Sequence, residues 1–374
     1  MITRELNHRI AVVTTSIAIP KLLRDYAFEA RTHSFDRTSF IFVGDKNTVR
    51  EAYDFCVKLQ EETGLVVHAL DQSSQESYLS RFPNLQTHIP WNSIQRRNVG
   101  MMLAYEQNAD LVITIDDDNY IVSGQDYFGS HSVAGSQTEC KVISSSTGWF
   151  NVCQALRERN GIPFFPRGYP LAERTFGSSC ADTGSETSAR IAVNAGLWLG
   201  DPDIDAFARL THKIESVDMK IDFAPTFALA FGTWAPFDSQ NTAFDRSVIP
   251  AYFLSPYVGR YDDIFAGLIV RRIADHLGQH ISFGQPLVRQ VRNPHNLLVD
   301  FDRERFGYET CDRFCELLRR SKLTKQDYLG CAREIVNWME GELVPFHGWT
   351  RDQRDNFSKY AAAYETWVEA FEGF

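Results

Sequence analysis

Three consecutive aspartates directly follow a short apolar segment, and this feature constrains the fold more than any other. Residues 111–115 read Leu-Val-Ile-Thr-Ile, and Asp116, Asp117 and Asp118 come next. A run that is short, largely β-branched and not amphipathic predicts a buried strand. Adjacent carboxylates repel one another, so a fold that keeps them together needs a shared cation. Because alternate residues of an extended chain point the same way, Asp116 and Asp118 can converge while Asp117 faces elsewhere.

Carboxylate oxygens suit Mg²⁺ or Mn²⁺, and such an ion with open coordination positions can carry a diphosphate. The alternative is a solvated acidic turn without a role. The strand in front of the acids favours the metal, because α/β sheets bind ligands at the carboxyl ends of their strands. We expect a third residue to coordinate the metal together with Asp116 and Asp118. His295 is one candidate and His276 is the other, and each can instead be a structural residue.

The composition is that of a globular protein that can bury a large core, with 374 residues, 44% hydrophobic and 23% charged. A net charge of −10 without a Lys/Arg-rich block argues against a nucleic-acid surface. No apolar run approaches the ~20 residues of a membrane span, and the first residues lack the apolar core of a signal peptide. Seven scattered cysteines without a CxxC pair indicate reduced thiols, so we expect a cytoplasmic protein.

Strand and helix patterns alternate through the first 120 residues. Strands are predicted at 9–16, 39–44, 65–70 and 111–115, and helices at 20–28, 48–63 and 94–107. This rhythm predicts a parallel sheet with right-handed crossovers. Neither GxGxxG nor GxxxxGK[ST] occurs, so neither a dinucleotide fingerprint nor a P-loop is supported.

Several polar side chains near predicted strand or helix ends are candidates for holding a nucleotide and its phosphates. They are Thr14, Asp45, Asp71, Arg96, Arg97, Asp116, Asp117 and Trp198. Arg167 and Arg174 can converge on a negatively charged substrate, although surface exposure explains their spacing equally well. Asp262 and Asp263 can act as a base or a charge stabiliser. They can also be helix caps, because acids are favoured at a helix start.

The pattern loosens after the aspartates. Residues 178–188 predict a mobile loop, 191–199 a strand, 223–246 an irregular aromatic segment, and the chain beyond 302 a set of helices. We therefore predict a catalytic domain at 1–300 and a helical extension at 301–374. Aromatic residues recur at helical spacing near the end of the chain, which indicates a core face or a contact between copies in a homo-oligomer. They are Phe357, Tyr360, Tyr364, Trp367 and Phe371.

Six segments, in order along residues 9–300, resemble the reversibly glycosylated polypeptide family. This family includes the UDP-arabinopyranose mutases and is a branch of the GT-A glycosyltransferases. The segments are Ile115–Asp118, Arg167–Arg174, Gly196–Leu199 with Asp203–Ala206, Ala243–Arg246, Arg260–Asp263 and Ala274–Gly278.

The resemblance implies an α/β, GT-A-like fold with a mixed, mainly parallel sheet and a C-terminal helical extension. It also implies a UDP-sugar substrate, Mn²⁺ or Mg²⁺ at the three aspartates, and reversible glycosylation of Arg167 with Arg174 as its companion. A neutral arginine at pH 7 costs roughly 9 kcal/mol, from a pKa up to ~13.8 at ~1.36 kcal/mol per unit. A carboxylate must therefore take the proton of Arg167 as its bond to sugar forms, and Asp262 or Asp263 would suit.

The function expected from these residues is a nucleotide-sugar pyranose/furanose mutase. One alternative is a metal-dependent glycosyltransferase that passes the sugar from a UDP-sugar to a separate acceptor. Another is a nucleotide-sugar-binding subunit without catalysis.

Overall fold

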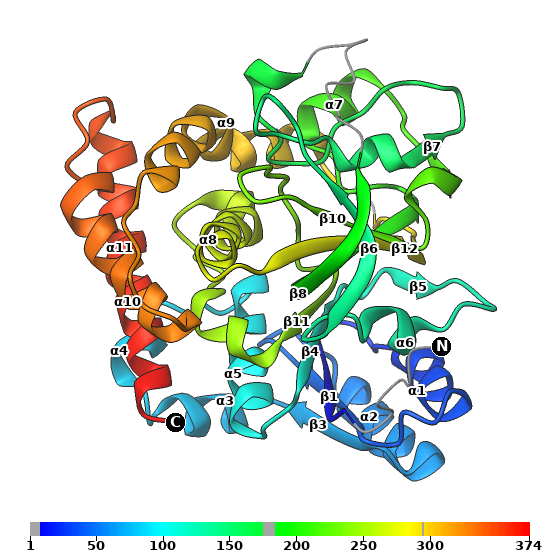
Figure 1. The fold of residues 1–374 in the computed structure, drawn as a ribbon. Coiled ribbons are helices and arrows are strands. Elements are labelled where there is room, and N and C mark those ends of the chain that lie inside the picture. Colours follow the sequence, from blue (N-terminus) through cyan, green and yellow to red (C-terminus); the bar gives the residue numbers. More distant parts are fainter. Residues whose placement is uncertain (1–7, 175–183, 294) are drawn as a thin grey trace.

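The computed structural model describes residues 8–174, 184–293 and 295–374, and one mixed twelve-stranded sheet runs through its centre (Figure 1). The strands are β1 (Ile10–Thr15), β2 (Thr38–Val43), β3 (Val66–Leu70), β4 (Leu111–Ile115), β5 (Asn119–Ile121), β6 (Gln137–Ile143), β7 (Leu156–Glu158), β8 (Ser185–Gly200), β9 (Ser216–Met219), β10 (Thr226–Leu229), β11 (Asn241–Asp245) and β12 (His280–Gln290).

Helices cover both faces of this sheet, and three of them form the C-terminal part of the chain. The helices are α1 (Leu23–Thr32), α2 (Arg50–Thr63), α3 (Gln72–Leu79), α4 (Pro83–Gln86), α5 (Arg97–Glu106), α6 (Tyr127–His131), α7 (Ala206–Thr211), α8 (Asp262–His276), α9 (Leu297–Arg319), α10 (Tyr328–Trp338) and α11 (Arg351–Glu372).

The first four long strands form the parallel half of the sheet in the order β3-β2-β1-β4. All four predicted strands and the helices between them are confirmed. The apolar runs in β1 and β4 are buried, as expected for strands covered on both faces. The strand order reverses between β1 and β4, so their carboxyl ends open a crevice, and this crevice is where α/β sheets bind ligands. Thr15 and Asp116 stand at its two sides.

The second half of the sheet combines antiparallel and parallel pairs. β11 runs antiparallel to β4 and to β8, while β12 runs parallel to β8 and antiparallel to β10 and β5. The mixed sheet with C-terminal helices is therefore confirmed.

Two predictions about loops in this half were wrong. Residues 185–188 begin β8 and pair with β6, while 178–183 lie outside the described residues. Residues 226–229 and 241–245 are strands within the segment that looked irregular. These stretches are short or exposed, so they form strands because their backbones pair with residues distant in the sequence. The local hydropathy pattern does not predict such pairing.

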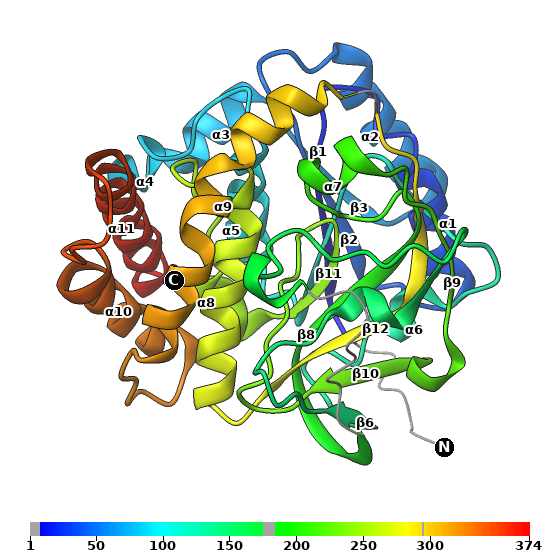
Figure 2. The same cartoon turned by 90° about the horizontal axis from the view of Figure 1, so that it is seen from above.

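Helix α8 lies between the sheet and the last helices, as the view from above shows (Figure 2). Phe265 of α8 contacts Phe314 of α9, with ring centroids 4.5 Å apart, and lies 6.2 Å from the ring of Phe357 of α11. All five residues of the C-terminal aromatic stripe are buried in the same hydrophobic core as the sheet. The stripe is therefore part of the core. The division into two domains at residue 300 stays a prediction, although α9 already begins at Leu297.

Over the described residues, none of the helices combines the length and the apolar character needed to cross a bilayer.

Replacing Trp367 by alanine should lower the free energy of unfolding by about 3–5 kcal/mol, because it removes a large buried side chain. Trp367 has no exposed surface, and its ring lies 5.3 Å from that of Phe253, which precedes α8. The matched control is Glu369→Ala on the exposed face of the same helix, which should change stability by no more than about 0.5 kcal/mol. Urea unfolding of both variants checks this, and equal losses would contradict the role of the stripe in the core.

Candidate functional site

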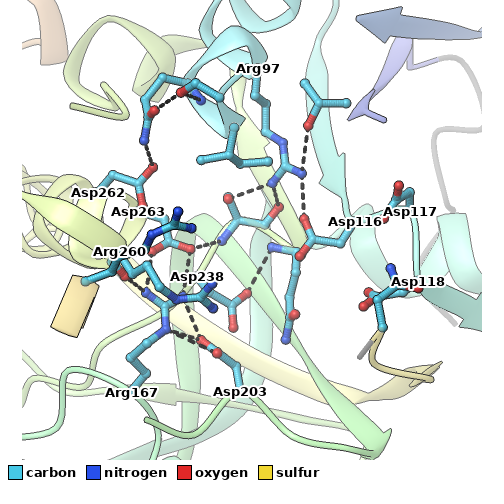
Figure 3. Close-up of a pocket in the computed structure, with 18 of the residues that line it drawn as sticks. Arg97, Asp116, Asp117, Asp118, Arg167, Asp203, Asp238, Arg260, Asp262 and Asp263 are labelled. Carbon is cyan, nitrogen blue, oxygen red and sulfur yellow. Dashed lines mark hydrogen bonds and ion pairs between the residues drawn. The ribbon is translucent and has the colours of Figure 1, made fainter. Parts of the chain in front are cut away.

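A cavity of about 600 Å³ opens at the crevice between β1 and β4, and its lining is dominated by charged side chains. Among the described residues it is lined by seven aspartates and five arginines, together with one histidine. They are Asp116, Asp117, Asp118, Asp203, Asp238, Asp262, Asp263, Arg97, Arg167, Arg260, Arg292, Arg303 and His295. Ten of these are labelled in Figure 3. Charge of this density in a partly enclosed space indicates a site for charged ligands.

Arg97 is fully buried at one side of the cavity and fixes the end of β4. Its Nη2 donates to Oδ1 of Asp116 at 2.5 Å and to the carbonyl of Ile115 at 3.2 Å. Its Nη1 donates to the carbonyl and hydroxyl oxygens of Ser239, at 2.9 and 2.7 Å. Burial alone would lower the pKa of Arg97, but Asp116 raises it. Arg97 therefore stays charged and holds three segments together.

The other two acids of the triplet point in different directions from Asp116 (Figure 3). Oδ2 of Asp117 accepts a hydrogen bond of 2.5 Å from Ser16. Oδ1 of Asp118 accepts a long hydrogen bond of 3.5 Å from Gln290. Burial and the negative charges of Asp116 and Asp117 raise the pKa of Asp118 to about 7. A negative charge on Asp118 is therefore disfavoured unless a cation balances it.

Arg167 occupies the opposite side of the cavity, between two carboxylates. Its Nη2 lies 2.9 Å from Oδ2 of Asp203, and its Nη1 lies 3.0 Å from Oδ1 of Asp263. Nη1 also donates to the carbonyl of Arg260. Burial would lower the pKa of Arg167, but Asp203 and Asp263 raise it well above its ordinary value. Without a covalent bond to sugar, the side chain of Arg167 is therefore a protonated guanidinium.

The backbone on both sides of this ion pair is packed closely. Gly168 has φ +83°, and a Cβ there would lie 2.4 Å from Cγ2 of Ile264. Only glycine combines this conformation with this contact. The turn that carries Arg167 and the helix turn that carries Asp263 therefore touch directly.

Residues 238–240 cross the cavity and connect its two sides. The carbonyl of Gln240 accepts hydrogen bonds from the backbone N–H of Asp116 at 3.1 Å and from Nδ2 of Asn119 at 2.6 Å. On the other side, the backbone N–H of Ser239 donates to Oδ2 of Asp263 at 3.3 Å. The site therefore has a continuous hydrogen-bonded frame from Asp116 to Arg167.

The two adjacent acids at the start of α8 have different environments. Asp263 contacts Arg167, whereas Oδ2 of Asp262 accepts a 2.6 Å hydrogen bond from Nε2 of Gln95. Burial and the charge of Asp263 raise the pKa of Asp262. Asp263 is therefore the carboxylate in direct contact with Arg167, and Asp262 is not.

Helix α9 contributes counter-charges to the basic residues of the cavity. Asp300 lies 3.3 Å from the guanidinium groups of Arg260 and of Arg292, and 3.0 Å from Nδ1 of His295. Glu304, one turn later, lies 3.4 Å from Nε of Arg260. The C-terminal helices thus help to orient the site.

Some predicted site residues lie outside the lining of this cavity. Thr14 is buried within β1, and its neighbour Thr15 lines the cavity instead, because alternate strand residues face opposite ways. Both carboxylate oxygens of Asp45 accept hydrogen bonds from the backbone of Asn92 and Ser93, so Asp45 shapes a lining loop without facing the cavity. Asp71 caps α3 by accepting from Ser74.

Three further predicted residues have structural partners. Arg96 donates to Gln75 and stacks on Trp91, with its guanidinium 3.7 Å from the ring centroid. Arg174 pairs with Asp205 at 2.6 Å, away from the lining. Trp198 borders a small separate cavity behind Arg167 and Asp203. Arg174 and Trp198 therefore stand behind the site rather than in it.

The three predicted metal ligands are not gathered together. Among the described residues, the histidine and carboxylate groups whose ligand atoms all lie within 4.8 Å of one another are Glu29, His33 and Asp126, near the C-terminal end of α1. His295 does line the cavity with Asp116 and Asp118. His276 does not, because it ends α8, which is roughly 21 Å long at 1.5 Å per residue, and it contacts Lys325. His276 therefore does not face this cavity.

Sequence reasoning gave no role to Asp203, Asp238, Arg260 and Arg292, which line the cavity. Asp203 and Arg260 do lie within segments that carried the family resemblance. Asp238 lies in an irregular segment and Arg292 follows the end of β12, and neither belongs to a segment that carried the resemblance.

The model of the reversibly glycosylated polypeptide family matches residues 76–374. This chain belongs to that family. The resemblance seen in the motif segments is confirmed, and the match extends through α9, α10 and α11, beyond Gly278 where the last recognised segment ends.

The chain is similar to named relatives and, more distantly, to a solved structure. It is 30% identical to UDP-arabinopyranose mutase 1 of Arabidopsis thaliana over 269 residues, which cover 70% of this chain and 68% of the relative. It is 33% identical to a probable UDP-arabinopyranose mutase 1 of Zea mays over 267 residues, which cover 70% and 67%. Glucosyl-3-phosphoglycerate synthase from Mycobacterium tuberculosis is a distant structural neighbour. Its complex with phosphoglyceric acid has a TM-score of 0.41 at 12% identity, covering 83% and 81% of the two chains.

Replacing Arg167 by methionine should lower the free energy of unfolding by about 3–5 kcal/mol at pH 7, because Asp203 and Asp263 stay buried without a partner. The control is Arg157→Met, whose exposed ion pair with Asp218 should contribute at most about 1 kcal/mol. Urea unfolding at pH 7 measures both effects.

The difference in free energy of unfolding between the wild type and Arg167→Met should become smaller as the pH falls from 7 to 5. In the wild type, burial opposes ionisation of Asp203, but Arg167 outweighs it and lowers the pKa of Asp203. The stabilisation that ionised Asp203 gives to the folded state is therefore complete above ~3.9, the pKa of an aspartate in the unfolded chain. It is lost as the pH falls through the lower pKa that Asp203 has in the folded protein. In the variant, the buried carboxyl of Asp203 has lost Arg167 and takes up a proton in mild acid, which removes the cost of its unpaired charge. A loss that grows on acidification would contradict this account.

Proposed function

We propose that this protein interconverts the pyranose and furanose forms of a UDP-bound sugar, with a UDP-pentose such as UDP-arabinose as the first candidate. The observation that carries the proposal is that Arg167 and Asp116–Asp118 face one cavity from opposite sides. A sugar attached to a diphosphate at the aspartates can then present its anomeric carbon to the guanidinium. Family membership and the names of the relatives support this choice over other nucleotide-sugar reactions.

The aspartate side of the cavity fits a divalent cation. Asp118 is half-buried beside two other acids, and burial together with their repulsion raises its pKa to about 7, so a cation there would stabilise the ionised carboxylate. Asp116 and Asp118 would hold the ion, since Mg²⁺-type sites commonly use one or two carboxylates together with substrate phosphates. When bound, Mn²⁺ or Mg²⁺ supplies charge stabilisation for the departing diphosphate.

His295 remains the candidate for a further ligand. Its Nδ1 lies 3.0 Å from Oδ2 of Asp300, which leaves Nε2 for a second partner. Metal-binding histidines usually donate their other ring N–H to a carboxylate in this way. The basic side chains of Arg260 and Arg292, held by the same Asp300, would face the diphosphate.

Arg167 would form the covalent bond to sugar. As the C1–O bond to diphosphate breaks, an Nη atom of Arg167 bonds to C1 and loses one proton. Asp203 and Asp263 raise the pKa of Arg167, so removal of this proton before the bond forms is disfavoured. Asp263, with Oδ1 3.0 Å from Nη1, accepts the proton within an existing hydrogen bond as the new bond forms. Return of the diphosphate reverses both changes.

Incubation of the protein with UDP-arabinopyranose and Mn²⁺ should yield the furanose isomer, measured by chromatography of the nucleotide sugars. Asp118→Asn should reduce the rate at least about 100-fold, the scale of losing one group that acts in the transition state. Asp36→Asn, a change at an exposed acid far from the cavity, should leave the rate unchanged. Hydrolysis without an isomer would instead indicate a transferase, and binding without turnover a non-catalytic subunit.

Intact-mass measurement after addition of UDP-arabinopyranose should show a gain of one sugar residue, mapped by fragmentation to Arg167. Arg167→Lys should neither gain this mass nor form the isomer, because a lysine ammonium cannot contact Asp203 and Asp263 as the planar guanidinium does. An Arg167→Lys or Arg167→Ala protein that still interconverts the two ring forms would remove the proposed covalent step.

A further inference from the structure

A change of ring size needs a proton exchange that Arg167 and its partners leave unassigned. When a pyranose ring opens, the ring oxygen must gain a proton, and when the furanose ring closes, the attacking hydroxyl must lose one. One group that gives a proton and later takes one back can serve both steps. This requirement follows from the proposed function, so the inference below depends on that function.

Asp238 lies where such a group is required. It belongs to the segment that joins the two sides of the cavity, and its carboxyl is drawn between the Arg167 pair and Asp116 (Figure 3). It lines the main cavity, and with Arg167 and Asp203 it also lines the small cavity behind them. A sugar that spans from the aspartate triplet to Arg167 therefore passes Asp238.

The other acids of the cavity are held by specific partners. Asp116 pairs with Arg97, and Asp203 and Asp263 share Arg167. Asp117 accepts from Ser16, and Asp262 accepts from Gln95. Asp118 stands at the predicted cation site. Within the described ranges, the hydrogen bond recorded for the carboxylate of Asp238 comes from the backbone N–H of Gln240, at 3.0 Å.

The surroundings of Asp238 favour its neutral, proton-carrying form. Only 4% of the residue is exposed. Burial and the negative charges of Asp203 and Asp263 raise the pKa of Asp238 well above its ordinary value, and the charge of Arg167 only partly opposes this. A carboxylic acid kept neutral in this way can act as a proton donor near neutral pH.

We propose that Asp238 is the acid–base residue of ring opening and ring closure. In the sugar–Arg167 adduct, the electron pair on the guanidine nitrogen forms a C1=N bond as the bond from C1 to the ring oxygen breaks. Asp238 gives its proton to that oxygen. The C4 hydroxyl then attacks C1, the electron pair returns to nitrogen, and the hydroxyl proton passes to the Asp238 carboxylate. Asp238 ends as it began, so no other reactant is consumed.

Asp238→Asn tests this role because the amide keeps the size of the side chain but cannot transfer the proton. Each protein is loaded with UDP-arabinopyranose, freed of excess nucleotide sugar, and then mixed with UDP. The wild type should return both ring forms. Asp238→Asn should form the adduct at Arg167 at a rate within about threefold of the wild type, and should return the pyranose with furanose formation reduced at least about 100-fold. The control is Asp36→Asn, which should behave as the wild type.

Two results would overturn the assignment to Asp238. One is ring interconversion by Asp238→Asn within about threefold of the wild-type rate. The other is equal loss of adduct and isomer in a folded variant, which indicates a role in binding. A wild-type protein that forms neither adduct nor isomer would instead refute the proposed function.

A second measurement covers an Asp238→Asn protein that fails to fold, as judged by circular dichroism. In the wild type, D₂O should slow furanose formation more than it slows adduct formation, because ring opening and closure add two proton transfers at Asp238 to the single transfer from Arg167 to Asp263 in the adduct step. An equal effect of D₂O on both steps would overturn the proposal.

Discussion

An excess of carboxylates over guanidinium groups in one partly enclosed cavity is the constraint on which the rest of the site depends. Charge is expensive to bury without a partner. Arg97 and Arg167 are therefore each placed among acids, and together they connect α5, β4, the 238–240 segment, the turn before Asp203 and α8. The acids that remain unpaired are left with raised pKa values, as at Asp118 and Asp238. Such an excess of negative charge can be reduced by binding a cation, as proposed at Asp118, or by keeping a carboxyl protonated, as proposed at Asp238.

The parts of the fold that the sequence predicted are those in which local pattern and burial agree. β1, β2 and β4 are largely apolar and buried, so the sequence alone places Asp116 at the carboxyl end of a buried parallel strand, which is the edge where such sheets bind ligands. Arg167 was identified through the family segments and not through its spacing. Asp203 and Asp238 were missed because their importance comes from strands and turns that meet only in three dimensions. Thr14 was predicted to contact the ligand, whereas its neighbour Thr15 lines the cavity. Because side chains alternate between the two faces of a strand, a shift of one residue moves the side chain to the opposite face.

The C-terminal helices take part in the site as well as in the core. Asp300 and Glu304 of α9 hold Arg260, Arg292 and His295, while the aromatic residues of α9 and α11 surround Phe265 of α8. The family match through residue 374 agrees with this arrangement, since these helices belong to the matched region. A purely helical pattern does not reveal such a role, because buried acids on a helix look like ordinary polar positions in the sequence.

The contact between Gly168 and Ile264 links the evolution of two distant segments. The glycine leaves no room for a side chain, and the isoleucine immediately follows Asp263 along α8. Enlarging either residue pushes the guanidinium of Arg167 away from its carboxylate. Because the positive φ already keeps position 168 a glycine, descendants of this sequence can change only position 264, and only to a side chain that needs no more room there than isoleucine does.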